Sequence, residues 1–90
     1  MSESLTAMPE QRPSLLTIYA RNVEHCAFKR GWPPTRLATE LGVTLNTLNR
    51  IRFARSRYID PEVFVALLEI FGCEPNDLLN PQPGIDYPVD

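Results

Sequence analysis

The side chains best suited to chemistry lie between residues 44 and 57, where amides, hydroxyls and guanidinium groups alternate with apolar residues. Amides and hydroxyls can bond to base edges, and asparagine offers adenine a paired donor and acceptor. Guanidinium groups bind guanine or phosphate oxygens. We therefore expect a nucleic-acid-binding surface made of Thr35, Arg36, Thr44, Leu45, Asn46, Thr47, Asn49, Arg50, Arg52, Arg55 and Arg57.

Basic residues are concentrated in this part of the chain, although the formal net charge of the 90 residues is −2. Residues 29–58 contain seven basic side chains and one acid, Glu40, whereas the rest of the chain contains two basic side chains and ten acids. Binding depends on the charge of the local surface, so this partition favours a nucleic-acid partner. An ordinary solvated basic surface is the alternative interpretation.

Composition argues against enzymatic, metal-binding and membrane functions. The carboxylates are scattered and no nucleophile, base and orienting group can be assembled, so we expect no enzyme and no cofactor. Cys26 and Cys73 form no CxxC pair and His25 is the single histidine, so we expect no metal site and reduced cysteines in a cytoplasmic protein. No run of about 18 apolar residues could span a membrane, and we expect no secretory signal.

Apolar spacing and capping residues predict the helices that position these side chains. Ser14, Thr44 and Asp60 are typical N-cap residues, and Gly42 and Gly72 are typical of helix ends. No segment alternates like a strand. We expect an all-α fold with helices near residues 14–30, 34–41, 44–53, 60–71 and 76–79.

The helical part is expected to form one domain with two appendages. Residues 1–13 have little apolar periodicity and are predicted to be a flexible arm. Residues 14–79 form the helical domain in this interpretation. Residues 80–90 contain three prolines and are predicted to be an extended tail.

The second and third expected helices are joined by the tight turn Gly42-Val43-Thr44, which is typical of a helix-turn-helix unit. In such a unit the second helix enters the major groove of double-stranded DNA. Leu48 and Ile51 mark the inner face of residues 44–53, and we expect them to be buried. The polar residues of that helix then face outward.

Two longer motifs support this interpretation. The stretch LATELGVTLNTLNRI matches the pattern LA..LGVS..T[IL]SRI, and FVALLEIFGCEPNDLL matches L..I...LG....DLL. The chain resembles, over residues 30–79, the lambda repressor/Cro-like family, also called the Xre family. The resemblance implies a five-helix lambda repressor-like DNA-binding domain that acts as a homodimer on partly symmetric sites. It also implies control of transcription, for example as a repressor.

The sequence departs from the family pattern at three places. Pro34 stands where a glutamine is common, Arg52 and Ala54 replace an acid and a glycine, and Leu45 replaces a polar residue. Leu45 and the acidic tail leave a second function open, in which the same fold binds a protein partner as an antiactivator or antitoxin.

Three further expectations concern aromatic residues and the dimer. Trp32 is predicted to fill the core, and Phe53 and Tyr58 are predicted to pack around the loop that follows residues 44–53. Residues 78–87 are the expected dimer region.

Overall fold

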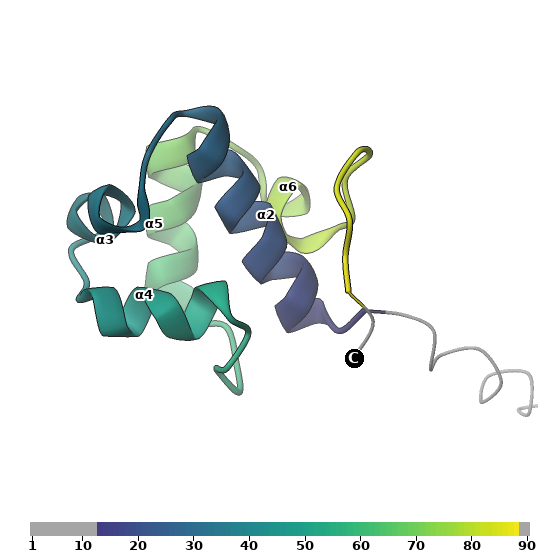
Figure 1. Ribbon diagram of the computed structural model, residues 1–90, viewed down its shortest axis with the longest axis horizontal. Coiled ribbons are helices and arrows are strands. Elements are labelled where there is room, and N and C mark those ends of the chain that lie inside the picture. Colours follow the sequence, from purple (N-terminus) through teal and green to yellow (C-terminus); the bar gives the residue numbers. More distant parts are fainter. Residues whose placement is uncertain (1–12, 89–90) are drawn as a thin grey trace, which may run out of the picture.

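Residues 13–88, the part of the chain that the computed structural model describes, contain five helices and no strand (Figure 1). The all-α, five-helix fold expected from the sequence is therefore confirmed. Residues 1–12 of the expected N-terminal arm lie outside the described residues. The helices are α2 (Leu15–Lys29), α3 (Pro34–Leu41), α4 (Leu45–Arg52), α5 (Pro61–Phe71) and α6 (Pro75–Leu79).

Local capping explains where the helices begin. The side-chain oxygens of Ser14 and Thr44 accept hydrogen bonds of 3.1 Å from the backbone amides of Thr17 and Thr47. Asp60 caps α5 in the same way by accepting from a first-turn amide at 2.9 Å. These bonds satisfy amides that have no partner inside the helix, so the three predicted N-caps are confirmed.

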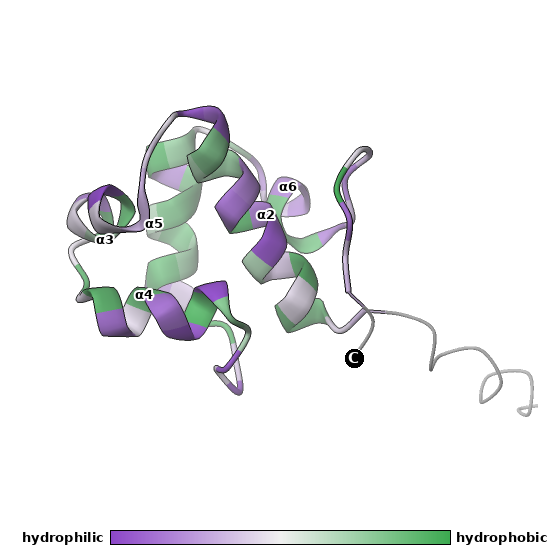
Figure 2. Cartoon of the chain, in the orientation of Figure 1, coloured by the Kyte–Doolittle hydropathy of each residue, from purple (hydrophilic) through white to green (hydrophobic). Residues whose placement is uncertain are grey.

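Each helix contributes one fully buried side chain to a common core. Val23, Leu37, Leu48, Leu67 and Leu78 come from the five helices in order, and each is at most 2% exposed. Figure 2 shows that α5 is hydrophobic along most of its length, whereas α4 alternates between hydrophobic and hydrophilic residues. The helices therefore depend on one another for burial, as expected for a small domain with a limited core.

The C-terminal tail is tethered to α2, a feature that the sequence did not indicate. Asn22 is 1% exposed, and its Nδ2 donates to the carbonyl oxygens of Leu78 and Asn80 at 2.9 Å each. The Tyr87 hydroxyl donates to Oδ1 of Asn22, and Figure 1 shows the tail running beside α2. Part of the expected dimer region is thus engaged within its own chain.

The aromatic residues fall into two groups. Trp32 packs against the core, with its ring centroid 6.1 Å from that of Phe71. Phe53 and Tyr58, by contrast, are 52% and 71% exposed, so neither ring is buried at the loop, although Arg55 of the loop lies 5.3 Å from the Phe53 ring centroid. Phe53 follows the last residue of α4 and does not share the buried side of the helix with Ile51. The Cζ atom of Arg52 lies 4.9 Å from the centroid of the Phe53 ring.

The loop after α4 contains a residue in an unfavourable backbone conformation. Ala54 has a φ of 53°, in the left-handed region that glycine adopts readily and alanine does not. Alanine stands here where the resembled family often has glycine, and the backbone at this position adopts the conformation that suits glycine.

We therefore expect Ala54→Gly to stabilise the protein. The left-handed conformation costs alanine about 1–2 kcal/mol, and glycine's extra backbone entropy offsets about half of the gain. The net effect of about 0.5–1 kcal/mol corresponds to a rise in Tm of roughly 2–8 °C in thermal unfolding. The control Ala66→Gly, in the interior of α5, should lower stability by about 1 kcal/mol. A fall in Tm for Ala54→Gly would contradict the assignment.

Candidate nucleic-acid interface

The turn between α3 and α4 holds the two helices in a fixed relation. Gly42 ends α3 with a φ of 75°, and the amide of Val43 donates to the carbonyl oxygen of Ala38 at 3.0 Å. A left-handed residue here reverses the chain and satisfies the last carbonyl groups of the helix. Thr44 follows at once as the N-cap of α4. The predicted turn between two short helices is therefore confirmed.

The orientation of α4 about its own axis is set by its apolar face. Leu48 and Ile51 are three residues apart, on one side of the helix, and both are buried. Most of the remaining positions therefore face outward. The structure exposes Thr44, Leu45, Asn46, Thr47 and Arg50 on α4 and its cap.

Arg52 differs from the other arginines of this region. Its Nε lies 2.8 Å from Oε2 of Glu24 on α2, and its Nη1 donates to Oδ1 of Asn49 at 2.9 Å. The Arg52 side chain is only 23% exposed. Arg52 and half-buried Asn49 thus brace α4 against α2. This role could not be predicted from the sequence because Glu24 is 28 residues away along the chain.

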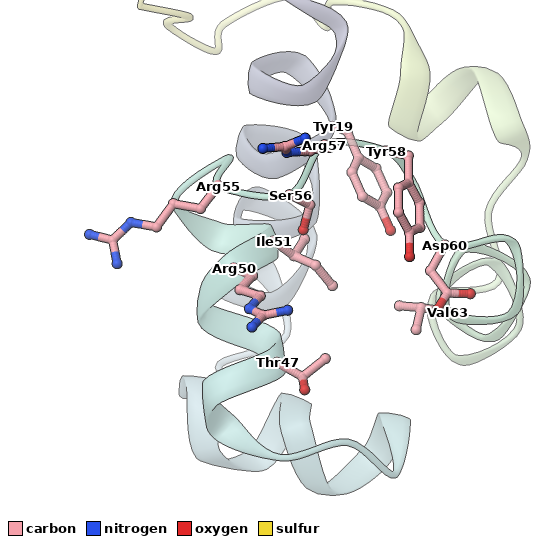
Figure 3. A pocket seen from close by; sticks show the side chains of 10 residues that line it. All are labelled: Tyr19, Thr47, Arg50, Ile51, Arg55, Ser56, Arg57, Tyr58, Asp60 and Val63. Carbon is pink, nitrogen blue, oxygen red and sulfur yellow. The ribbon is translucent and has the colours of Figure 1, made fainter.

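Arg50, Arg55 and Arg57 are exposed and carry positive charge that the protein does not neutralise. Within residues 13–88, none of them makes a side-chain hydrogen bond or ion pair. Figure 3 shows the guanidinium group of Arg55 extending away from the helix, where its Cζ lies 5.3 Å from the centroid of the Phe53 ring. The three charges therefore remain available to an anionic partner.

The predicted residues on α3 lie near the start of that helix. Thr35 and Arg36 are exposed in its first turn, directly after Pro34 at position N1. Arg36 pairs with Glu40 at 3.0 Å and stacks over the ring of Trp32, with 4.9 Å from Cζ to the ring centroid. This charge is partly neutralised, in contrast to the three arginines after Asn49.

Other chemistry finds no support in the described part of the chain. It contains no cluster of three or more His, Cys, Asp or Glu side chains able to hold a metal ion. Cys26 and Cys73 are half-buried free thiols, and burial raises the pKa of each, which disfavours the reactive thiolate. None of the five helices is long and apolar enough to cross a membrane.

Comparisons with known proteins agree with this geometry. Residues 22–84 match the family model of the Cro/C1-type HTH DNA-binding domain. The fold is similar to that of a hypothetical transcription factor, NHTF, from Neisseria, with a TM-score of 0.69 and 20% sequence identity. That likeness covers 76% of this chain and 77% of the other, and at this identity it concerns the fold alone. No curated protein sequence matches the chain.

A double-mutant cycle measures how strongly Arg52 braces α4. We expect Glu24→Gln and Arg52→Gln to show a coupling of about 0.5–1 kcal/mol in urea unfolding, because the pair is partly buried and well aligned. The matched control is Arg36→Gln with Glu40→Gln, an exposed pair within one helix, for which we expect about 0.3–0.5 kcal/mol. Zero coupling between Glu24 and Arg52 would contradict the bracing role.

Proposed function

Because the chain belongs to the Cro/C1-type HTH DNA-binding domain family, we propose that this DNA-binding regulator reads the major groove with α4. One observation carries the proposal: the outward face of α4 is polar and exposed, and it includes or adjoins three arginines, Arg50, Arg55 and Arg57, whose charge no acid of the described residues pairs. The major groove, about 12 Å wide, admits a helix of this kind.

The residues of the surface divide into two roles. Asn46 and Thr47 lie in the first turn of α4 and are the proposed contacts to base edges. The proposed contacts to phosphate are Arg50, Arg55 and Arg57. Thr35, Arg36 and Thr44 are proposed to contact phosphates of the adjacent DNA strand. Phosphate contacts orient the protein but carry no sequence information of their own.

Arg52 and Asn49 receive a different role from the one that the sequence suggested. Their mutual hydrogen bond and the ion pair of Arg52 with Glu24 stabilise the packing of α4 against α2. We propose that they position the recognition surface and that Asn49 does not read a base.

We further propose that two copies bind together. A single short helix contacts few base pairs, and pairing two copies doubles the length of DNA that is read. The half-sites should then lie about 34 Å apart, one turn of the duplex.

The affinity for DNA should fall steeply with salt. Each phosphate contact releases counterions and adds about −0.9 to the slope of log K against log salt, so three contacts in each of two subunits give roughly −5. Fluorescence anisotropy with a labelled duplex measures this slope. Arg57→Ala should reduce its magnitude by about 0.9 per subunit, whereas Lys29→Ala, an equal charge change at the far end of α2, should not. A flat salt response would exclude the phosphate contacts.

Sequence reading should depend on Asn46. Asn46→Ala should cost about 1–3 kcal/mol on a site selected by the wild-type protein from random duplexes, with little effect on random sequence. The matched control is Asn76→Ala, because Asn76 is also exposed at the second position of a helix, α6. If Asn46→Ala weakens both kinds of DNA equally, Asn46 holds the backbone and does not read bases.

A second candidate function rests on Leu45, which is 41% exposed at the start of α4. An exposed leucine can contact a thymine methyl group, or it can belong to a protein interface. In the second case the chain binds a protein partner and controls it as an antiactivator or antitoxin. Leu45→Asp should abolish DNA binding if α4 enters the groove; unchanged DNA binding would favour the protein partner.

A further inference from the structure

A cavity lies beside the proposed DNA surface and is not explained by it. The cavity has a volume of about 370 Å³ and is bounded by α4, the loop of residues 53–60 and the beginning of α5 (Figure 3). Volumes of about 300–1,000 Å³ are typical of pockets that bind small molecules.

The first sign of a ligand is the hydroxyl group of Tyr19. Tyr19 comes from α2, is 3% exposed, and lines the cavity. Its hydroxyl is buried without a hydrogen-bond partner among the described residues, although buried polar groups are almost always paired. Figure 3 shows this hydroxyl directed, like that of Tyr58, toward the space between Ile51 and Asp60.

Tyr19 can act only as a neutral group at ordinary pH. Burial, together with the nearby carboxylate of Asp60, raises the pKa of Tyr19 to about 12. The phenol therefore keeps its proton and can donate a hydrogen bond to an acceptor in the cavity. Thr47 offers a second hydroxyl to the cavity: its Oγ1 accepts from Thr44 at 3.0 Å, and a hydroxyl that accepts one bond can still donate its own proton.

The charge of the lining favours an anion. Arg50 and Arg57 line the cavity and have no side-chain partner in the described part of the chain. Asp60 is the one acid among the described lining residues, and it already accepts the amide of Glu62 as the cap of α5. Arg55 also borders the cavity, but Figure 3 shows its guanidinium pointing away.

The rest of the lining favours an apolar body attached to that anion. Ile51, Val63 and the two tyrosine rings present hydrocarbon surface to the cavity. A bare phosphate would leave this surface in contact with water. An organic acid would cover it and gain the hydrophobic contribution of burial.

We propose that this cavity binds a small organic anion whose acidic group pairs with Arg50 and accepts a hydrogen bond from Tyr19, while its apolar body contacts Ile51 and Val63. The cavity shares Thr47, Arg50, Arg55 and Arg57 with the proposed DNA surface, and Arg50 is the residue that would pair with either anion. An anion bound in the cavity therefore competes with a DNA phosphate for Arg50. This consequence rests on the proposed function.

The first experiment measures ligand binding in the absence of DNA. The full ¹⁵N-labelled chain is titrated with benzoate, with its neutral analogue benzamide, and with inorganic phosphate, and the amide signals of residues 50–58 are followed by NMR. Benzoate should bind in the millimolar range or tighter. Benzamide should bind at least about tenfold more weakly, because it lacks the charge that pairs with arginine. Phosphate should also bind more weakly, because it lacks the apolar body.

Two variants test the role of the buried hydroxyl. Tyr19→Phe removes one oxygen atom and should weaken benzoate binding about tenfold while leaving thermal stability unchanged or higher. The matched control is Tyr87→Phe, which removes a hydroxyl that binds Asn22 far from the cavity and should leave benzoate affinity unchanged. Arg50→Gln should weaken benzoate by a similar factor or more, while the fold, measured by circular dichroism, stays intact.

Each contrary result is decisive. Three results would overturn the proposal: no change in the NMR signals with benzoate, equal binding of benzamide and benzoate, or unchanged benzoate affinity in a Tyr19→Phe variant that has lost stability. The last result would mean that the Tyr19 hydroxyl bonds within the protein. Phosphate binding as tightly as benzoate would assign the cavity to a DNA phosphate instead. Saturating benzoate should weaken DNA binding severalfold. Retained DNA affinity with benzoate bound would contradict the DNA role of Arg50 and leave the ligand site standing.

Discussion

Leu48 of α4 is fully buried among the other helices, and this contact orients the helix that carries the proposed DNA surface. The α4 helix is eight residues long, which is about two turns. Its buried residues, Leu48 and Ile51, form a single apolar face. Once Leu48 and Ile51 enter the core, every other position of α4 has its direction assigned. The polar surface is a consequence of core packing, because the same rotation that buries the leucine presents Asn46 and Thr47 to solvent.

The arginines that follow show how a small domain divides its charge between structure and binding. Arg52 is used internally by Glu24 and Asn49, at a position where its side chain is largely covered. Arg50 and Arg57, two and five positions away, point to other sides of the helix and loop and find no acid. Since the acids lie mostly outside residues 29–58, the local field around α4 stays positive in a chain whose net charge is −2.

Two buried polar groups on α2 lead to opposite conclusions. Asn22 bonds to Leu78 of α6 and to Asn80 and Tyr87 of the C-terminal tail, so it is a structural anchor that holds residues 80–87 against the domain. Tyr19, one turn earlier, is equally buried and has an unused hydroxyl. An unpaired polar group in a low-dielectric interior costs free energy. The unpaired hydroxyl of Tyr19 beside a cavity therefore suggests a ligand, whereas the fully paired amide of Asn22 does not.

The local features of this protein could be predicted from its amino-acid sequence: five helices, their caps at Ser14, Thr44 and Asp60, the Gly42 turn and the inward face of α4. These follow from interactions between residues within four positions of one another, which a linear pattern records. The outward placement of Asn46, Thr47 and Arg50 could be predicted for the same reason.

Three other features depend on how the helices pack: the pairing of Arg52 with Glu24, the anchoring of the tail by Asn22, and the exposure of Phe53 and Tyr58. Each depends on which side chains from distant parts of the chain meet when the helices pack. Sequence patterns show that an arginine is charged or a tyrosine apolar. They cannot show whether a partner lies opposite, because that partner is brought there by the burial of other residues.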